Sequence, residues 1–274
     1  METETTTSLP VVRYNGQSGS ETLDALAVEE PLEIRVAGEP LAITMRTPGQ
    51  DDWLAVGFLL SEGIIKGLGD VSRVYHCGRP GTEEYANTID IIPASGTTFD
   101  LERVSSSKRG TLTTAACGVC GRKSIDDLMD RCSSVKSGPT MSANAIRLGV
   151  ATLRDSQPTF ELTGGVHAAG ICDPRGKSLV CCEDIGRHNA VDKSIGSLLY
   201  KDGWPEQAAI LAVSGRASFE MIQKAATAGL PVVASVSAAS TLAVSLAEKL
   251  GITVAGFVRG STMNIYSHHE RISK

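Results

Sequence analysis

Residues 209–257 decide the fold, and they read AILAVSGRASFEMIQKAATAGLPVVASVSAASTLAVSLAEKLGITVAGF. Apolar runs that suit buried strands alternate here with segments of helical periodicity. In chain order these segments are Ala209–Val213, Ser218–Ala228, Val232–Val236, Thr241–Leu250 and Ile252–Phe257. Gly229 and Gly251 follow the two helical segments at C-cap positions, and Pro231 stops the first helix from continuing. The stretch predicts a βαβαβ unit with parallel strands and right-handed crossovers.

The same α/β rhythm extends toward the N-terminus. The hydrophobic pattern predicts a helix over Ser142–Leu153, strands over Gly165–Ile171 and Ser178–Cys182, and a second helix over Asn189–Leu199. We therefore assign residues 124–274 to one α/β domain, which is of ordinary domain size.

Residues 26–105 are expected to form a smaller α+β domain. Alternating apolar residues predict two strands within Pro31–Arg46, on either side of a turn at Gly38–Pro40. The same kind of pattern predicts strands over Val71–Cys77 and Thr88–Ile92.

A helix is expected between these pairs of strands. Thr47-Pro48 resembles a helix start, because proline is tolerated in the first turn of a helix. The segment Asp51–Ile65 carries apolar residues at helical spacing, and it would end near Gly67. Residues 1–25 are polar, and they are predicted to form a flexible N-terminal arm.

The composition is that of an ordinary globular chain, and it argues against several classes of protein. The 274 residues are 42% hydrophobic and 21% charged, with a formal net charge of -5. This acidic balance argues against a nucleic-acid-binding protein. The sequence shows no signal peptide and no apolar run of membrane-spanning length, so we expect no membrane association. Seven scattered cysteines without an export signal indicate reduced thiols in the cytoplasm.

Residues 106–123 are predicted to form a loop that carries two closely spaced cysteines. Cys117 and Cys120 stand in the run AACGVCG, and Arg122 and Lys123 follow directly. Neighbouring cations favour the thiolate, which is the reactive form of cysteine. Two thiols at this spacing can cycle as dithiol and disulfide, bind a soft metal or carry sulfur as a persulfide. They can also be inert structural thiols.

Metal binding and thioredoxin-like chemistry both fit the pattern poorly. A structural zinc site needs four cysteine or histidine ligands, often in two close pairs. Cys181 and Cys182 are adjacent in a predicted strand, so their side chains should point to opposite faces. We therefore expect no second chelating pair and no metal site. A thioredoxin-like motif begins a helix after a strand, whereas this pair follows a polar loop.

Three strand ends of the βαβαβ unit carry small and polar residues. Ser214-Gly215-Arg216 follows the first strand, Ser237 follows the second, and a segment from Val258 to Thr262 follows the third. In open parallel sheets, ligands bind beyond the carboxyl ends of the strands. Helix N-termini and arginine side chains at such ends attract phosphate. Taken singly, each segment also fits a turn or a helix cap. Together they predict a phosphate or nucleotide site.

Polar residues also crowd the segment from Glu183 to Lys193. His188 is a candidate acid–base group, with Asp184 or Asp192 as the carboxylate that orients it. The alternative is a buried polar network that fixes the start of the following helix. His167 can face the same cleft or be an ordinary core histidine.

Taken together, these motifs resemble those of the formate dehydrogenase accessory protein FdhD family. The resemblance extends from about Glu30 to Tyr266 and leaves out the N-terminal arm. The runs that carry it, in order, are Cys117–Gly121, Gly164–Ala169, Asp184–Lys193, Ser214–Glu220 and Phe257–Tyr266.

This resemblance implies a sulfurtransferase. Such a protein takes persulfide sulfur from a cysteine desulfurase and passes it to the bis-molybdopterin guanine dinucleotide form of the molybdenum cofactor, which formate dehydrogenase then receives. By the same resemblance Cys117 would carry the persulfide, and Cys120 would assist or be dispensable. The candidate cofactor-binding residues are Ser214, Gly215, Arg216, His188, Phe257, Val258, Arg259, Gly260, Ser261 and Thr262.

The resemblance also implies a fold and an assembly. It implies a cytidine-deaminase-like three-layer α/β domain with a smaller N-terminal α+β domain, in a homodimer. No cofactor would be bound permanently; the molybdenum cofactor would bind as a substrate, and GDP would mimic its nucleotide part. The zinc signature of deaminases is not reproduced, because Ala168 and Ala169 follow His167 where a glutamate would be needed.

Two other functions remain open on these arguments. One is a cofactor chaperone that holds the molybdenum cofactor without transferring sulfur. The other is a zinc-dependent nucleobase deaminase. Cysteine variants separate the first from a sulfurtransferase, and metal analysis of the purified protein separates the second.

Overall fold

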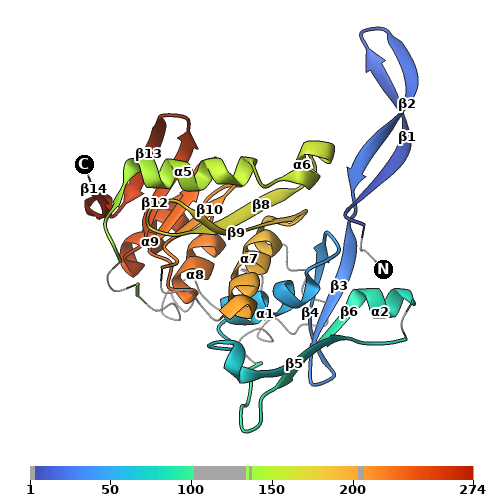
Figure 1. Cartoon of the computed structure of the whole chain (residues 1–274), viewed down its shortest axis with the longest axis horizontal. Coiled ribbons are helices and arrows are strands. Elements are labelled where there is room, and N and C mark those ends of the chain that lie inside the picture. The colour runs from blue at the N-terminus through green and yellow to red at the C-terminus, as the bar shows by residue number, and fades with distance from the viewer. Residues whose placement is uncertain (1–3, 80, 102–133, 136–137, 203–206, 274) are drawn as a thin grey trace.

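The computed structural model describes residues 4–79, 81–101, 134–135, 138–202 and 207–273, and its largest element is a six-stranded mixed sheet (Figure 1). The strand order is β13-β12-β11-β10-β8-β9. Their bounds are β8 (His167–Cys172), β9 (Ser178–Asp184), β10 (Ile210–Val213), β11 (Val232–Ser235), β12 (Thr253–Arg259) and β13 (Thr262–Ser267). Strands β10, β11 and β12 are parallel neighbours, which confirms the predicted βαβαβ unit. The flanking pairs β8–β10, β8–β9 and β12–β13 are antiparallel.

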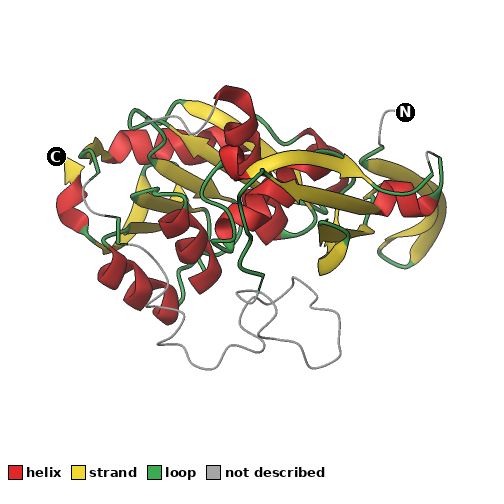
Figure 2. Cartoon of the chain, turned by 90° about the horizontal axis from the view of Figure 1, so that it is seen from below, coloured by secondary structure: helices red, strands yellow, loops and turns green. Residues whose placement is uncertain are grey.

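Helices cover both faces of this sheet (Figures 1 and 2). One face is covered by α5 (Ala143–Arg154). The other is covered by α7 (Arg187–Asp202), α8 (Phe219–Thr227) and α9 (Thr241–Leu250). Successive residues of β10 belong to different clusters: Ile210 packs in the α5 cluster, and Leu211 packs in the cluster with α7, α8 and α9. Because both faces are covered, the central strands are apolar without alternation.

Local sequence signals set the ends of the helices behind the strands. The side chain of Ser240 accepts a hydrogen bond from the Ala243 amide and caps α9. Gly251 ends α9 in the left-handed conformation, with φ of 78°, and its amide donates to the Ala247 carbonyl. The predicted bounds of α9 are therefore confirmed.

A second sheet of four strands belongs to the N-terminal part, in the order β4-β3-β6-β5. The strands are β3 (Glu30–Val36), β4 (Glu39–Arg46), β5 (Val71–His76) and β6 (Thr88–Pro93). These match the predicted strands closely. Short helices η1 (Leu68–Asp70) and α2 (Glu83–Asn87) connect them.

Helix α1 (Asp51–Ser61) lies between the two sheets, and its predicted bounds are wrong at both ends. It does not start at Thr47-Pro48, because Gln50 has a left-handed backbone with φ of 58°. The guanidinium of buried Arg46 donates to both carboxylate oxygens of Asp51, the first helical residue. The helix ends at Ser61, well before Gly67.

Helices α1 and α7 join the N-terminal part to the larger sheet through glycines. A Cβ atom placed on Gly57 of α1 would collide with the carbonyl oxygen of Asp192 on α7. A Cβ atom on Gly196 of α7 would likewise collide with the carbonyl oxygen of Trp53. The two helices therefore touch backbone to backbone, which only glycine permits.

Residues 6–27 cover most of the predicted N-terminal arm, and they have regular secondary structure. They form a β-hairpin of β1 (Thr6–Asn15) and β2 (Ser18–Ala27), which projects from the body of the molecule (Figure 1). Whether this arm is flexible stays a prediction. The sequence analysis also missed α6 (Pro158–Thr163).

Two short strands and a 3-10 helix lie near the C-terminus and before α5. Strands β7 (Met141–Ser142) and β14 (Ile272–Ser273) pair in parallel, and η2 (His269–Arg271) precedes β14. The predicted cysteine loop, residues 106–123, lies outside the described residues, so the proposed domain boundaries stay predictions. Within the described ranges, every helix is too short or too polar to cross a bilayer.

Candidate functional site

The three strand ends that the sequence singled out lie side by side at the carboxyl edge of β10, β11 and β12. The Val236 amide donates to the Val213 carbonyl at 3.1 Å, and the Phe257 amide donates to the Ser237 carbonyl at 2.9 Å. The Ser235 hydroxyl donates to the Gly215 carbonyl at 2.7 Å. These bonds fix the three turns against one another.

The third strand end has an unusual backbone. Phe257 has φ of 51°, in the left-handed region that a bulky side chain rarely adopts, and its ring is 41% exposed. The pairing of β12 with β13 shifts register between Gly256 and Arg259. Such bulges redirect side chains, and strained backbone of this kind gathers at functional sites.

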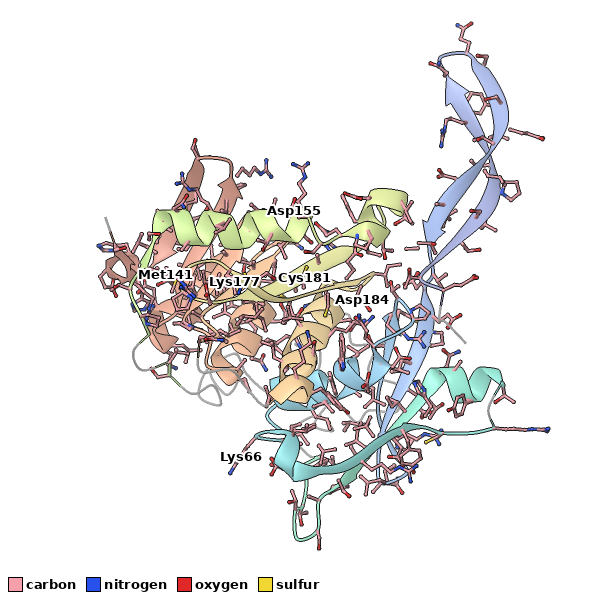
Figure 3. The ribbon with its side chains drawn as sticks, in the orientation of Figure 1. Lys66, Met141, Asp155, Lys177, Cys181 and Asp184 are labelled. Carbon is pink, nitrogen blue, oxygen red and sulfur yellow. The ribbon has the colours of Figure 1, made fainter. Side chains whose placement is uncertain are left out.

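A cavity of about 900 Å³ opens at this edge of the sheet, on the side covered by α5. That volume is at the upper end of the range for small-molecule and cofactor sites. Of the predicted residues, Ser214, Val258, Arg259 and Gly260 line it. The remaining lining residues are Arg147, Val150, Ala151, Leu153, Arg154, Asp155, Gln157, Phe160, Gly164, Gly165, Val166, His167 and Val236. Asp155, which also lines the cavity, directly follows α5 and is labelled in Figure 3.

The charges in the cavity wall are mainly positive. The wall contains three arginines, Arg147, Arg154 and Arg259, and one carboxylate, Asp155. Arg259 Nε donates to the Val236 carbonyl at 3.1 Å, and Arg147 Nη1 donates to the Ser261 carbonyl at 3.1 Å. The guanidinium groups of Arg147 and Arg259 are thus held in place at the wall, and the three arginines favour an anionic ligand such as a phosphate.

His167, left open by the sequence, is the histidine of the cavity wall. Burial lowers its pKa from the ordinary value, and the charge of Arg187 lowers it further. The imidazole is therefore held in its neutral form, which can both donate and accept a hydrogen bond.

His188, predicted as a cofactor-binding residue, does not line the cavity. It is 9% exposed, at the start of α7, and its Nε2 stands 3.9 Å from a carboxylate oxygen of Glu220. That separation is an ion-pair distance, too long for a hydrogen bond. His188 is the largest cause that lowers the pKa of Glu220, to about 2.

The predicted pairing of His188 with Asp184 or Asp192 is wrong, because both carboxylates are engaged elsewhere. Asp184 lies 2.8 Å from the Lys193 ammonium and accepts from the Asn189 amide group. Asp192 accepts from Lys224 at 2.7 Å. Asp184 also accepts from the backbone amide of Thr47, at the end of β9 where the two sheets meet (Figure 3). These groups form the structural network that was the alternative interpretation.

Other predicted residues stand around the cavity rather than in its wall. Gly215 lies close to it, because a Cβ atom there would sit 3.6 Å from His167 Nδ1. Arg216 is exposed. Phe257, Ser261 and Thr262 lie in or beside the β12–β13 turn.

Arg147 and Arg154 were not among the residues predicted from the sequence. They are seven residues apart on α5 and therefore lie on one face of that helix. This spacing indicated that the two arginines share a helix face. Nothing in the sequence showed that this face of α5 meets the ends of β11 and β12.

Cys117 and Cys120 lie outside the described residues, so their surroundings stay a prediction. Three other cysteines are poor nucleophiles. Burial raises the pKa of Cys172 to about 11 and that of Cys181 to about 12, and it raises the pKa of Cys182 as well. As predicted, Cys181 and Cys182 pack into different clusters on opposite faces of β9. In the part of the chain that the structure describes, no group of three cysteine, histidine or acidic side chains could hold a metal.

Replacing Glu220 with glutamine should destabilise the protein in a pH-dependent way. The carboxylate has a lower pKa in the folded protein, about 2, than its ordinary value of 4.5. Its ionised form therefore stabilises the fold fully above pH 4.5, and this contribution is lost as the pH falls toward about 2. Urea unfolding of Glu220→Gln at pH 7 and at descending pH should show a difference from the wild type that shrinks below pH 4.5. The exposed Glu161→Gln is the control, and a difference that is constant with pH would contradict the assignment.

Comparison with known proteins places the chain. The family model described as FdhD/NarQ family matches residues 27–273. The chain belongs to this family.

Relatives named "Sulfur carrier protein FdhD" match nearly the whole chain. The protein of Anaeromyxobacter dehalogenans is 53% identical over 262 residues, which cover 93% of this chain and 91% of the relative. That of Nocardia farcinica is 46% identical over 266 residues, which cover 96% and 93%.

A solved structure has the same fold. It is described as a formate dehydrogenase accessory protein from Desulfotalea psychrophila, with a TM-score of 0.77 and 22% sequence identity. The match covers 98% of this chain and 100% of that chain.

Proposed function

We propose that this protein is a sulfurtransferase that supplies sulfur to the molybdenum cofactor of a formate dehydrogenase. The relatives that match more than nine-tenths of the chain are named as sulfur carriers, and the structural relative is described as a formate dehydrogenase accessory protein. The structural observation that carries the proposal is the cavity at the strand ends, with three arginines in its wall. It suits the phosphates of bis-molybdopterin guanine dinucleotide, which would bind as a substrate.

Sulfur would enter the protein by thiol exchange at Cys117. The Cys117 thiolate attacks the outer sulfur of a cysteine desulfurase's persulfide, a new S–S bond forms, and the thiolate of the desulfurase leaves. Arg122 and Lys123 follow the pair in sequence and favour the thiolate. Cys120 would assist this step or be dispensable.

Residues 134–135, which follow the cysteine-bearing segment in sequence, lie at one end of the larger sheet. This end is the one away from the cavity. The amide of Val135 and the hydroxyl of Ser134 both donate to the carbonyl of Leu250, at the C-terminal end of α9. The cavity lies at the opposite edge, where β10, β11 and β12 end.

Arg259→Ala should weaken the binding of GDP, used as a probe for the nucleotide part of the cofactor. Loss of one charged hydrogen bond costs about 1.5–3 kcal/mol, which corresponds to about a 10- to 150-fold higher Kd. Titration calorimetry of GDP measures this change. Lys177→Ala, an exposed lysine of the β8–β9 turn, is the matched control, and Arg216→Ala should have a smaller effect because Arg216 does not line the cavity. An unchanged Kd for Arg259→Ala would move the nucleotide site elsewhere.

Cys117→Ala should abolish the maturation of formate dehydrogenase, while its GDP affinity stays at the wild-type value. The assay is formate dehydrogenase activity in cells that lack the endogenous protein and express the variant. Cys120→Ala and Cys172→Ala serve as comparisons, the second because the Cys172 thiol is buried with a raised pKa. Full maturation by Cys117→Ala would favour a cofactor chaperone that transfers no sulfur.

The finer parts of the resemblance belong to the same proposal. We propose that the protein works in the cytoplasm as a homodimer, and that its larger domain has a cytidine-deaminase-like fold. The strand order with helices on both faces supports the fold assignment.

A further inference from the structure

The β1–β2 hairpin exposes large apolar side chains to an extent that its own fold does not explain. Tyr14 is 72% exposed and Leu23 is 68% exposed, and Val12 is also more than half exposed. In the antiparallel register Val12 pairs with Glu21, and Tyr14 pairs with Gly19. Because side chains alternate between faces, Pro10, Val12, Tyr14 and Leu23 share one face of the hairpin.

That face is weakly charged. A Cβ atom at Gly19 would lie 2.9 Å from Val12 and 3.2 Å from the Tyr14 ring, so both side chains lie over the glycine. Glu21 is the charged residue on this face within β1 and β2; Arg13 and Asp24 pair with each other on the other face, 3.1 Å apart. An apolar face of this kind marks a protein interface.

The isolated hairpin would not be a stable fold, so its apolar face needs a partner. Two-stranded hairpins are marginal in water, and a third layer is needed to bury the apolar face. In this chain the body meets the hairpin where α6 packs against β2, near its base. Beyond that contact both strands extend into solvent (Figure 1).

Helix α6 continues the apolar surface from the base of the hairpin. Phe160 is 43% exposed and Leu162 is 66% exposed. Gly165, just after this helix, lies against Ala27 at the end of β2. Phe160 also lines the cavity, so the apolar surface reaches the wall of the candidate site.

We propose that the hairpin is an exchanged arm that lies on α6 of a second copy of this chain. One sequence then supplies both halves of the interface, the apolar arm and the apolar α6 surface, as a two-fold symmetric contact requires. The hairpin lies outside residues 27–273, the range that the family model matches.

The area available favours exchange over a simple stacking of two hairpins. Ten-residue strands are about 33 Å long and two of them are about 10 Å wide, which gives roughly 330 Å² for one face. Two stacked hairpins would bury roughly 660 Å² in total, less than a stable interface needs. If each arm lies with one whole face against the second copy, on α6 and the surface around it, the two contacts bury roughly 1,300 Å² in total, which is within the range of stable complexes.

In this arrangement, the two copies of the proposed homodimer meet through the hairpin and α6. The inference rests on one part of the proposed function, the homodimer. It does not depend on sulfur transfer. Since Phe160 lines the cavity, the arm of the second copy would lie beside the cavity wall.

Sedimentation equilibrium of the full-length chain and of three variants tests the proposal. Leu23→Glu places a charge on the apolar face of the arm, and Leu162→Glu places one on exposed α6. Each should raise the dimer Kd about 100-fold, the effect of losing an interface hot spot. Ser20→Glu is the matched control, because Ser20 lies on the other face opposite Arg13; it should leave the Kd unchanged.

Circular dichroism and the melting temperature check that each variant is folded. A wild-type chain that stays monomeric at high concentration would overturn the proposal, as would folded Leu23→Glu with the wild-type dimer Kd. Persulfide loading of Cys117 in the same variants is a separate readout, and its failure would count against the proposed function without touching the arm.

Discussion

Replacing Gly196 with alanine should cost the protein about 3 kcal/mol or more of its free energy of unfolding, or prevent it from folding. A Cβ atom at this position would run into the backbone of Trp53 on α1. Relief would require α1 and α7 to move apart. Polar bonds across the same contact resist this, since the hydroxyl of Ser61 on α1 donates to Asp192 on α7 at 2.7 Å.

Chemical unfolding of Gly196→Ala, monitored by circular dichroism, measures the loss. Gly57→Ala should behave alike, because a Cβ atom there meets the carbonyl oxygen of Asp192. Ser197→Ala is the control on the next residue of α7. Ser197 is fully buried and its hydroxyl has no hydrogen-bond partner within the described ranges, so its removal should be neutral or slightly stabilising. A loss of less than 1 kcal/mol for both glycine variants would mean that the two helices are not held in backbone contact.

Lys193→Met should destabilise the protein by about 3–5 kcal/mol, because it leaves a buried carboxylate without its cation. Asp184 is fully buried, and the Lys193 ammonium lies 2.8 Å from it. Burial raises the pKa of Asp184, which the charge of Lys193 opposes. Lys193 also donates to the Thr47 carbonyl at 2.8 Å, so the pair ties α7 to the chain between β4 and α1.

The same unfolding experiment tests this pair, with exposed Lys201→Met on α7 as the matched control. The double variant Asp184→Asn with Lys193→Met should recover part of the lost stability, because the unpaired charge is gone. A double variant that is less stable than Lys193→Met would show that the cost arises from packing rather than from the buried charge.

The sequence predicted the parts of the fold that depend on local pattern. The βαβαβ unit follows from apolar runs that are separated by capped helices. Gly251 ends α9 at the predicted position, because glycine readily adopts the left-handed conformation found there. The shared edge of the strand ends then follows from parallel topology, and the structure confirms that Ser214 and Arg259 line one cavity.

Features that depend on contacts between residues far apart in the chain could not be predicted from the sequence. The start of α1 is set by the left-handed backbone of Gln50 and by the bond from Arg46 to Asp51. The hairpin was missed because polar residues mask its alternation, and its apolar face finds no partner within its own fold. His188 was assigned the wrong carboxylates, because Glu220 comes from a different helix and meets it only in the folded chain.

The central claim is that Cys117 carries sulfur, and intact mass spectrometry tests it most directly. The purified protein would be incubated with an active cognate cysteine desulfurase and cysteine. We predict a gain of one sulfur, about 32 Da, that reductant removes and that Cys117→Ala lacks, because a reactive thiolate accepts the sulfur. The thiols of Cys172, Cys181 and Cys182, whose pKa values are raised, should stay unmodified. No gain in mass, or the same gain in Cys117→Ala, would contradict the account.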